Sequence, residues 1–454
     1  MANLSLTLDS AVLTKLSKSY PEEVSDGKSS ECASGSLKDL LEWLAVPPAF
    51  STLRVNTFVV SSSEALMQVV KQLKETCNLQ GKPELRVEIH PTLFDCLLVH
   101  NTGPHLPQQQ AEKEVIVDHA CGMAVLRGAD VFKQGIVGAP LSMKCGERVR
   151  VMADLDARCL RGFSRVYQGS KMYVGTGVAL VDRDELFCTS AVSRGVGVQM
   201  SEALYHSPSL SDFLPKIVFP QNLPSIICGH VLGPRPGETI LDMCAAPGGK
   251  TSHIAALMNN EGRVVALDKT ADKVAKIRSN LENFCLTCVE SYVFDARKAC
   301  SKDSDEVGEP PYPPATFDRV LLDGPCSALG QRPAVRNKMT AGCMASFPKL
   351  QRMLLTAAVH LVREGGTLVY STCSLPVEEN EDQVAWVLDN FPALVLEEQT
   401  PHLGGCGLAH SSLSAANCRL VQRFDPSRLS RIATRDCNSD TIGFFIAKFR
   451  KVSR

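Results

Sequence analysis

Short apolar runs alternate with helix-like patterns through the second half of the chain. Strand-like runs occupy 239–243, 264–268, 292–295, 317–323, 367–373 and 442–449, and helical patterns occupy 250–258, 271–284, 350–362 and 377–391. Apolar runs of this length, each followed by a polar loop, are typical of buried parallel strands. The pattern predicts a doubly wound α/β domain over residues 204–454.

The middle of the chain, residues 111–203, has a different texture. Short strand-like runs punctuated by glycine recur at 125–128, 135–137, 148–152, 172–174 and 195–198. This spacing favours a compact all-β barrel of about 80–90 residues, and we see no apolar pattern of helical length within it.

Residues 1–110 mix two structural patterns. Helical spacing at 37–44 and 63–74 alternates with short strands at 53–57 and 97–99, which predicts a small α+β segment. Residues 22–35 are rich in Ser, Glu and Gly without periodicity, so we expect a mobile linker there.

Bulk composition narrows the class of protein. With 454 residues, of which 44% are hydrophobic and 21% charged, the chain reads as a globular protein of two or three domains. No apolar stretch reaches the ~18 residues that span a bilayer, and no basic segment precedes an apolar one at the N-terminus. We therefore expect a cytoplasmic protein without membrane contact, whose 18 cysteines are mostly reduced.

Charge is unevenly spread, although the net charge is only −1. Residues 127–175 hold nine basic and four acidic residues, a local net charge of +5. Such a face can bind phosphates, but an ordinary solvated surface explains the charge equally well.

Two cysteines end adjacent predicted strands. Cys326 follows Asp323-Gly324-Pro325, and Cys373 follows Ser371-Thr372. Ligands of open α/β sheets bind outside the carboxyl ends of the strands, so both thiols should meet in one crevice. A single cysteine is most often a packed small residue, but two at neighbouring strand ends indicate nucleophilic chemistry on an electrophilic substrate.

A third strand opens into a glycine-rich loop. This loop is Cys244-Ala245-Ala246-Pro247-Gly248-Gly249-Lys250, and Asp268 and Asp295 end the next two strands. Exposed backbone N–H groups at a helix start, with an acid 20 residues after Gly248, fit a nucleoside-type cofactor. A P-loop would need glycine in place of Cys244, and a purely structural turn leaves the spacing of Asp268 unexplained.

Three other features receive plainer interpretations. Cys285 and Cys288 lack partners at zinc-ligand spacing, so we expect no metal site. His253 should be half-buried in the helix after Lys250. The acids of the run 378–382 need no role beyond complementing a helix dipole.

The quoted motifs resemble those of the NOP/Sun family of RNA cytosine-5 methyltransferases. The likeness rests on Asp242 with the loop 245–250, on Asp323-x-Pro325-Cys326-Ser327, on Ser371-Thr372-Cys373-Ser374 and on Arg54-Val55-Asn56-Thr57. Residues 126–129 and 135–137 are similar to a PUA domain, which indicates the PUA-containing tRNA-modifying branch. The chain differs from the usual motif at Gly324, where alanine is common, and at Ala328, where glycine is common.

The resemblance implies a fold and a reaction. The fold would be a Rossmann-like S-adenosylmethionine-dependent methyltransferase sheet with an inserted PUA barrel. Cytosine C5 is a poor nucleophile, so a thiolate must first add at C6 before C5 takes the methyl group. By resemblance, Cys373 is that nucleophile, Cys326 assists proton loss and release, Asp323 holds or protonates N3, and Lys250 contacts the base or supports the thiolate.

The same resemblance assigns cofactor and RNA contacts. The cofactor would lie against residues 244–250 and Asp323, with Asp268, Lys273 and Asp295 at its ribose and adenine. The substrate would be tRNA, with its CCA end on the barrel and the target cytidine in the acceptor stem. Single-stranded RNA suits a mixture of cations and a ring, and the barrel offers Arg127, Phe132, Lys133, Arg158 and Arg161.

Two alternatives remain open from the sequence. A non-catalytic RNA-binding protein would not need to keep Cys373, Cys326, Asp323 and Lys250 together. In a DNA cytosine-5 methyltransferase the thiol of the Pro-Cys motif, here Cys326, would be the nucleophile, and the motif at Thr372-Cys373 favours the RNA enzyme instead.

Overall fold

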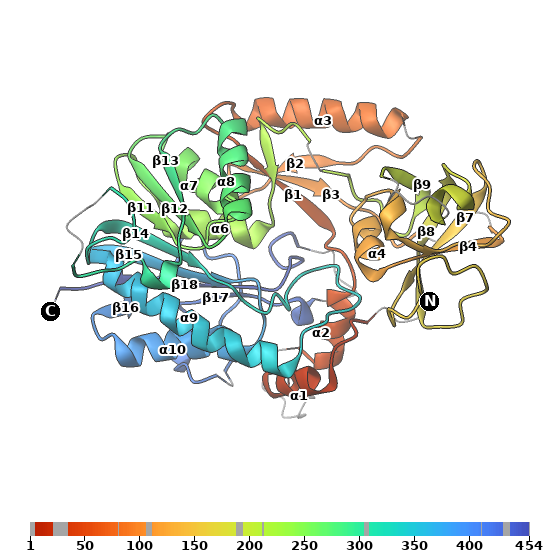
Figure 1. The fold of residues 1–454 in the computed structure, drawn as a ribbon. Helices are drawn as coiled ribbons and strands as arrows, with labels where there is room; N and C mark the ends of the chain where they lie inside the picture. Colours follow the sequence, from red (N-terminus) through yellow and green to blue (C-terminus); the bar gives the residue numbers. More distant parts are fainter. Residues whose placement is uncertain are drawn as a thin grey trace.

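The structure is a computed structural model that describes residues 5–20, 35–79, 81–105, 111–187, 194–210, 213–303, 308–409, 411–429 and 436–453. Figure 1 shows a large α/β part that holds the C-terminal half, a smaller sheet beneath α3, and a strand-rich part at the opposite end from the C-terminus. Within these ranges no helix has both the length and the apolar character needed to cross a membrane.

Among the residues that the structure describes, the large sheet has eight strands. Its order is β13-β12-β11-β14-β15-β18-β16, and β17 pairs with β18. The strands are β11 (Thr239–Asp242), β12 (Arg263–Asp268), β13 (Val289–Val293), β14 (Phe317–Asp323), β15 (Val362–Thr372), β16 (Leu394–Leu396), β17 (Gln422–Phe424) and β18 (Phe444–Lys451). Strands β11 to β15 pair in parallel and β18 is antiparallel to β15, so the predicted doubly wound α/β sheet is confirmed.

Helices cover both faces of this sheet. Helices α6 (Leu223–Leu232), α7 (Gly249–Leu257) and α8 (Ala271–Asn283) lie on one face, and α9 (Ala341–Leu361) and α10 (Glu381–Asn390) lie on the other (Figure 1). Successive strand residues point to opposite faces: Ile240 packs in the core that holds α6 and α7, and Leu241 packs in the core beneath α9. Because both faces are covered, the strands read as continuous apolar runs.

The chain reverses its direction across the sheet between β11 and β14. Strands β12 and β13 extend to one side of β11, and β14 and β15 extend to the other. Such a switch point leaves a crevice outside the carboxyl ends of the strands, where ligands bind. The loops after β11, β12, β14 and β15 therefore share one edge of the sheet.

Several predicted boundaries differ from the observed ones. Helix α9 begins at Ala341 rather than at 350, capped by the Thr340 side chain, and most residues of its first turns are exposed. An exposed stretch carries no apolar stripe, so the pattern did not show it. The predicted helix 377–391 is divided into the 3-10 turn η3 (Val377–Glu379) and α10, and the strand predicted at 292–295 is β13.

The smaller sheet has the order β10-β1-β3-β2. It contains β1 (Phe50–Val55), β2 (Val87–Ile89), β3 (Cys96–His100) and β10 (Val218–Pro220), beside α3 (Ser62–Leu79). Strand β10 follows the barrel in sequence yet pairs with β1, so the barrel is inserted within this sheet. The division at residues 110 and 203 stays a proposal, and the sheet itself crosses it.

The described part of the barrel segment, 111–187 and 194–203, holds a six-stranded sheet with the order β5-β9-β8-β7-β4-β6. Its elements are β4 (Lys113–Val117), α4 (His119–Leu126), β5 (Val131–Phe132), η1 (Lys133–Gly135), β6 (Ile136–Gly138), β7 (Arg148–Asp154), β8 (Lys171–Ala179), α5 (Arg183–Phe187) and β9 (Val196–Ala203).

The strand predicted at 125–128 is wrong, as is the expectation that no helix interrupts this segment. Val125 and Leu126 are the buried last residues of α4, a helix that begins after Asp118, whose side chain accepts a hydrogen bond from the Cys121 N–H. A short buried apolar run has the same composition in a strand and in a short helix, so periodicity could not separate them.

The N-terminal helices pack against the large domain rather than the small sheet. Residues of α1 (Ser10–Ser19) and α2 (Leu37–Leu44) share a core with Leu329, Met344 and Leu375. The remaining short elements are η2 (Ala296–Lys298), α11 (Ala415–Cys418) and η4 (Pro426–Arg428). The linker predicted at 22–35 lies outside the described residues except for Gly35.

Candidate active site

The two cysteines singled out in the sequence face each other. Strand β14 pairs in parallel with β15, with Asp323 opposite Ser371, so the residues just beyond both strands meet. The Cys326 and Cys373 sulfur atoms are 3.5 Å apart, and both residues are partly buried. The convergence predicted from the strand ends is present.

The contact between the sulfurs gives the two thiols different acidities. The hydrogen bond with Cys326 lowers the pKa of Cys373, and the Lys250 ammonium acts in the same direction. The same bond, together with burial, raises the pKa of Cys326 well above its usual value. Cys373 is therefore the thiol that ionises first, while Cys326 keeps the shared proton.

Lys250 and Asp323 form an ion pair beside the thiols. Lys250 Nζ lies 2.7 Å from Asp323 Oδ2, and Ser371 Oγ donates to Asp323 Oδ1 at 2.7 Å. Burial alone would lower the pKa of Lys250, but the attraction of Asp323 outweighs it and the pKa is raised. The lysine thus stays cationic in a site where it supports a neighbouring thiolate.

The loop after β11 lines a cavity of about 170 Å³. Gly248 has a φ of 104°, in the left-handed region that favours glycine, and Gly249 begins α7. A Cβ on Gly249 would lie 2.8 Å from the Phe219 ring, so a side chain does not fit there. The lining residues are Phe219, Pro220, Gln221, Asn222, Ser225, Asp242, Cys244, Ala245, Ala246, Pro247, Gly249, Lys250 and Asp323.

Asp242 ends β11 inside this cavity. Its Oδ2 accepts a hydrogen bond from Thr251 Oγ1 at 2.7 Å, whereas the buried Oδ1 has no partner. Burial raises the pKa of Asp242 to about 7, although the Thr251 hydrogen bond opposes the shift. The cavity therefore contains one buried carboxylate oxygen with an unused capacity to accept a hydrogen bond.

Asp268, Lys273 and Asp295 lie along the same edge of the sheet. Asp268 ends β12, is 6% exposed, and accepts hydrogen bonds from the Ala246 N–H and the Lys269 N–H at 3.1 and 2.7 Å. Lys273 Nζ lies 3.3 Å from Asp268 Oδ1. Asp295, two residues beyond β13, pairs with Arg297, and this contact lowers its pKa to about 2. Asp268 thus supports the loop directly, and Asp295 remains a carboxylate.

The run of acids at 378–382 does more than complement a helix dipole, so that interpretation is wrong. Glu379, Asn380 and Glu381 are fully buried. Glu379 accepts hydrogen bonds from the loops of both cysteines, and Glu381 pairs with the buried guanidinium of Arg423 at 3.1 Å. Cys-Ser recurs at 326–327 and 373–374, but nothing in the sequence links either pair to this acidic run.

His253 is 1% exposed rather than half-buried. Its Nε2 and that of His230 lie 2.7 and 2.8 Å from the two carboxylate oxygens of Asp95. Among the described residues these three form the one group of His, Cys, Asp or Glu whose ligand atoms lie close enough for a cation. Hydrogen bonds already account for the short contacts, and Cys285 and Cys288 are not in that group.

The five barrel residues predicted to touch RNA differ in their surroundings. Phe132 is 51% exposed, Lys133 begins η1, and Arg158 is exposed. Arg127 caps α4 and lines a pocket at the junction of the domains. The Arg161 guanidinium instead donates to the carbonyls of Gln134, Ile136 and Leu186, so it holds barrel loops together.

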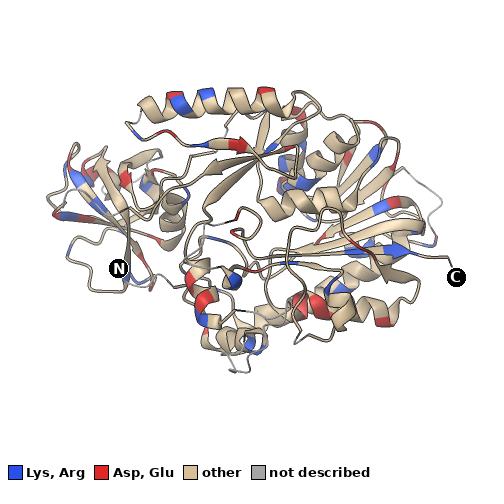
Figure 2. Ribbon diagram, turned by 180° about the vertical axis from the view of Figure 1, so that it is seen from behind, with Lys and Arg blue, Asp and Glu red and all other residues tan. Residues whose placement is uncertain are grey.

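The excess of positive charge counted over 127–175 is partly cancelled in the fold. Lys144, Arg148, Arg150 and Lys171 pair with acids outside that stretch, namely Asp182, Glu202 and Glu114. Figure 2 shows blue and red residues interspersed on the barrel rather than one uniform basic face. Adjacent strands bring together charges that are distant in the sequence.

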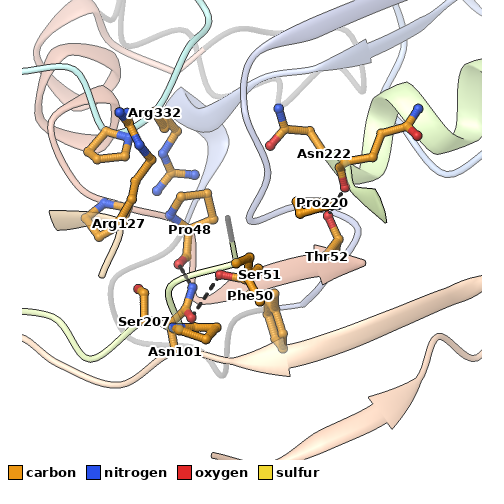
Figure 3. Close-up of a pocket in the computed structure, with 15 residues that line it drawn as sticks. Pro48, Phe50, Ser51, Thr52, Asn101, Arg127, Ser207, Pro220, Asn222 and Arg332 are labelled. Atoms are coloured by element: carbon orange, nitrogen blue, oxygen red, sulfur yellow. Dashed lines mark hydrogen bonds between the residues drawn. The ribbon is translucent and has the colours of Figure 1, made fainter. Parts of the chain in front are cut away.

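A second pocket, of about 360 Å³, lies where the three parts of the chain meet (Figure 3). Figure 3 shows Arg127 and Arg332 close together on one side and Asn222 on the other. The lining also includes Asn101 of the small domain and Ser207 of the segment that leaves the barrel. Pro220, Gln221 and Asn222 line both this junction pocket and the cavity at Asp242, so the two are neighbours.

Ala328, one of the two departures from the usual motif, has an unusual backbone conformation. Ala328 has a φ of 54°, a left-handed conformation that glycine adopts without steric cost. The glycine common at this position would fit the observed turn, and alanine adopts it here two residues after Cys326.

Comparison with known proteins identifies the family. The family model for the 16S rRNA methyltransferase RsmB/F matches residues 229–450. The tRNA (cytosine(72)-C(5))-methyltransferase NSUN6 of Homo sapiens is 44% identical over 91% of this chain and 90% of its own length, and that of Mus musculus is 42% identical over 95% and 93%. A tRNA (cytosine(72)-C(5))-methyltransferase of Pyrococcus horikoshii is 30% identical over 96% and 98%.

A solved structure agrees with this match. The crystal structure of NSun6 from Pyrococcus horikoshii with SFG, an analogue of S-adenosylmethionine, superimposes with a TM-score of 0.74 at 30% identity, covering 92% of this chain and 94% of that one. The likeness spans the small sheet and the barrel as well as the large sheet, because almost the whole of each chain is covered. The chain belongs to the RsmB/F-type NOP/Sun family of S-adenosylmethionine-dependent RNA cytosine-C5 methyltransferases.

Proposed function

We propose that this protein methylates C5 of cytosine 72 in tRNA, with Cys373 as the nucleophile and Cys326 as its assistant. Position 72 is the target named for the human, mouse and archaeal relatives. The observation that carries the proposal is the 3.5 Å contact between the Cys326 and Cys373 sulfur atoms beside the Lys250–Asp323 ion pair. The pKa values of the two thiols are shifted in opposite directions. A packed structural pair would need neither that asymmetry nor an ion pair at the mouth of a cavity.

The cavity after β11 fits the cofactor. S-adenosylmethionine, when bound, supplies an electrophilic methyl group on a sulfonium. The unpartnered Oδ1 of Asp242 can accept a hydrogen bond from an ammonium group, and the loop 244–249 presents backbone to a ligand at the start of α7. Asp268 and Asp295 lie at the ends of the next two strands, where their side chains can bind a ribose and an adenine edge, and Lys273 lies beside Asp268.

The thiols divide the covalent chemistry. Cys373 adds as a thiolate to C6 of the cytosine and makes C5 nucleophilic toward the methyl group. The proton on C5 must then leave, and the Cys373–C6 bond must break. Cys326, next to the adduct sulfur, can give its proton to the departing Cys373 sulfur, and the Cys326 thiolate can take the C5 proton while the C5–H electron pair re-forms the C5–C6 double bond.

The ion pair stabilises charge that develops on the base. Addition at C6 places negative charge on the ring, most of it at N3. The Lys250–Asp323 pair offers an ammonium donor and a carboxylate acceptor in one place, so it can hold a proton near N3 and accept one from the exocyclic amine. Ser371 fixes the carboxylate orientation by its hydrogen bond to Oδ1.

The junction pocket supports the proposed path of the RNA. It joins Arg127 of the barrel to Asn222, which also lines the cofactor cavity. We propose that the CCA end lies on the barrel near Arg127, Phe132, Lys133 and Arg158, while the target base enters at Cys373. Arg161 contributes by holding the barrel loops. The cytoplasmic location and the lack of a metal requirement stay predictions from the sequence.

Methyl transfer from labelled cofactor tests the function. The purified full chain should label cytosine 72 of a tRNA transcript, and site mapping should find no product in DNA of the same sequence. A transcript that lacks CCA should be a much poorer substrate. Labelling of DNA, or labelling of tRNA at other cytosines only, would contradict the proposal.

A further inference from the structure

A single buried carboxylate lies between the two cysteine loops. Glu379 is fully buried at the end of η3. Its Oε2 accepts hydrogen bonds from the Ser327 N–H at 2.8 Å and the Gln351 side-chain amide at 3.2 Å, and its Oε1 accepts one from Ser374 Oγ at 3.1 Å. These donors come from three segments that the sequence keeps apart.

Two of these donors directly follow the thiols. Ser327 is the residue after Cys326, and Ser374 is the residue after Cys373. The two serine hydroxyls also hydrogen-bond to each other. Gln351 donates in addition to the Pro325 carbonyl at 3.1 Å, on the other side of Cys326. Hydrogen bonds to one carboxylate therefore anchor the backbone beside each cysteine.

The turn that carries Glu379 is itself held by its neighbours. Tyr370 Oη donates to the Glu379 carbonyl at 2.6 Å, and the Asn380 side-chain amide donates to the Ser374 carbonyl at 3.0 Å. Asn380 Oδ1 also accepts a hydrogen bond from Thr372 Oγ1, one residue before Cys373. A turn fixed at this many points cannot shift without moving a cysteine loop.

Charge adds to geometry. Lys250 lowers the pKa of Cys373, although Asp323 opposes it, whereas the Glu379 charge adds to the Cys373 hydrogen bond and to burial in raising the pKa of Cys326. A negative charge near a thiol disfavours its thiolate. Burial raises the pKa of Glu379 above its ordinary value, but hydrogen bonds from Ser327, Ser374 and Gln351 oppose that shift.

We infer that Glu379 is a positioning residue that anchors both cysteine loops, so that Cys326 and Cys373 stay at reacting distance and Cys373 rather than Cys326 attacks. The role in methylation rests on the proposed function; the ordering of the two thiols does not. Without this carboxylate either cysteine could carry the thiolate, and the two loops would lose their common anchor.

Alkylation of the free enzyme tests the inference without RNA or cofactor. Wild type, Glu379→Gln and Glu379→Asp are treated with iodoacetamide from pH 6 to pH 10, and modification of each cysteine is followed by mass spectrometry. In wild type Cys373 should react at lower pH than Cys326. In Glu379→Gln the reactivity of Cys326 relative to Cys373 should rise about tenfold, as expected for one pKa unit, and Glu379→Asp should restore part of the difference.

Two further variants separate this role from general stability. Glu378→Gln changes the neighbouring acid, which is partly exposed and makes no side-chain hydrogen bond to either loop, and should leave the order of reaction unchanged. Ser374→Ala removes one donor to Glu379 without changing charge, so it serves if Glu379→Gln fails to fold, and should reduce kcat with KM for tRNA unchanged.

The outcomes are distinct. Unchanged relative reactivity in a folded Glu379→Gln variant would overturn the inference, as would an equal change at both cysteines that follows a lower melting temperature. A reordering of the thiols in an enzyme that fails to methylate tRNA would support the inference while rejecting the proposed function.

Discussion

Arg54 Nη2 donates a hydrogen bond to Ser252 Oγ at 2.7 Å, although the two residues are 198 positions apart. The contact joins β1 of the small sheet to the first turn of α7, which carries Lys250. A second bridge joins Asp95 to His253 of the same helix. The small domain therefore anchors α7, the helix that begins at the cofactor loop. This contact gives Arg54 of the motif Arg54-Val55-Asn56 a structural role.

Replacing Arg54 by methionine should cost ~2–4 kcal/mol of stability, because the acceptors on Gln221, Gly249 and Ser252 lose a buried donor. Cofactor affinity should fall as well, since α7 loses its anchor. Urea unfolding and calorimetry with S-adenosylmethionine measure the two effects. Arg86→Met, at a side chain 70% exposed, is the control and should change stability by less than ~0.5 kcal/mol.

Removal of either cysteine should block turnover, but only one of the two removals should leave a protein–RNA adduct. Cys373→Ala should abolish both methylation and trapping on 5-fluorocytidine RNA. Cys326→Ala should also block turnover but accumulate a protein–RNA adduct, because attack survives and release does not. Denaturing gels distinguish these results, and adduct formation by Cys373→Ala alone would assign attack to Cys326 instead.

How much the sequence could show depended on whether a general rule of the fold brings the residues together. The meeting of Cys326 and Cys373 followed from two strand ends and the rule for parallel sheets. The burial of Glu379 did not, because its donors at Ser327 and Gln351 lie 52 and 28 positions away and only folding brings them together. An acidic run with no visible partner reads as solvated surface.

The barrel shows the same limit. Counting charges over 127–175 missed Glu114, Asp182 and Glu202, which lie across strands or loops from the cations that they neutralise. The short helix α4 was hidden because Val125 and Leu126 are buried in a helix as they would be in a strand. Likewise β10 is only three residues long, and its pairing with β1 spans the whole inserted barrel.

Asp268→Ala should weaken cofactor binding by about 30- to 1,000-fold, the loss expected for ~2–4 kcal/mol of charge-assisted hydrogen bonds. Binding of tRNA should change little. Part of the loss should come from the loop itself, because Asp268 also accepts the Ala246 N–H. Calorimetry gives both affinities. Asp272→Ala, an exposed acid on α8, is the control, and an unchanged cofactor affinity for Asp268→Ala would remove this residue from the site.

Asp242 should make stability depend on pH. Its folded-state pKa is about 7, whereas an unfolded aspartate has a pKa of about 3.9. Between these values the folded protein keeps a proton that the unfolded chain has released. The stability contributed by this group is therefore complete below pH ~4 and is lost as the pH rises through about 7.

Asp242→Asn imitates the protonated carboxyl and removes this dependence. The variant should gain ~2–4 kcal/mol relative to wild type between pH ~4.5 and pH ~8, measured by urea unfolding at both values. For Asp303→Asn, at an exposed position, the stability relative to wild type should be the same at both pH values. A difference between Asp242→Asn and wild type that stays constant with pH would mean that Asp242 is ionised throughout.

The barrel should grip the 3′ end of the RNA through Arg127 and Lys133. Changing both to alanine should lower tRNA affinity and flatten its salt dependence by about two phosphate contacts, while cofactor affinity stays the same. Arg127 lines the junction pocket, and Lys133 directly follows Phe132, whose exposed ring can stack on an unstacked base.

Removal of CCA from the tRNA tests whether Arg127 and Lys133 contact the 3′ end. The loss of affinity should be large for wild type and small for the Arg127→Ala, Lys133→Ala protein, because the variant has already lost those contacts. Lys71→Ala with Lys74→Ala removes the same charge from the exposed face of α3 and should behave as wild type does. Salt titrations of binding to both transcripts give the comparison. Equal losses for wild type and the barrel variant would mean that the barrel binds elsewhere on the tRNA, since a contact to CCA must disappear with CCA.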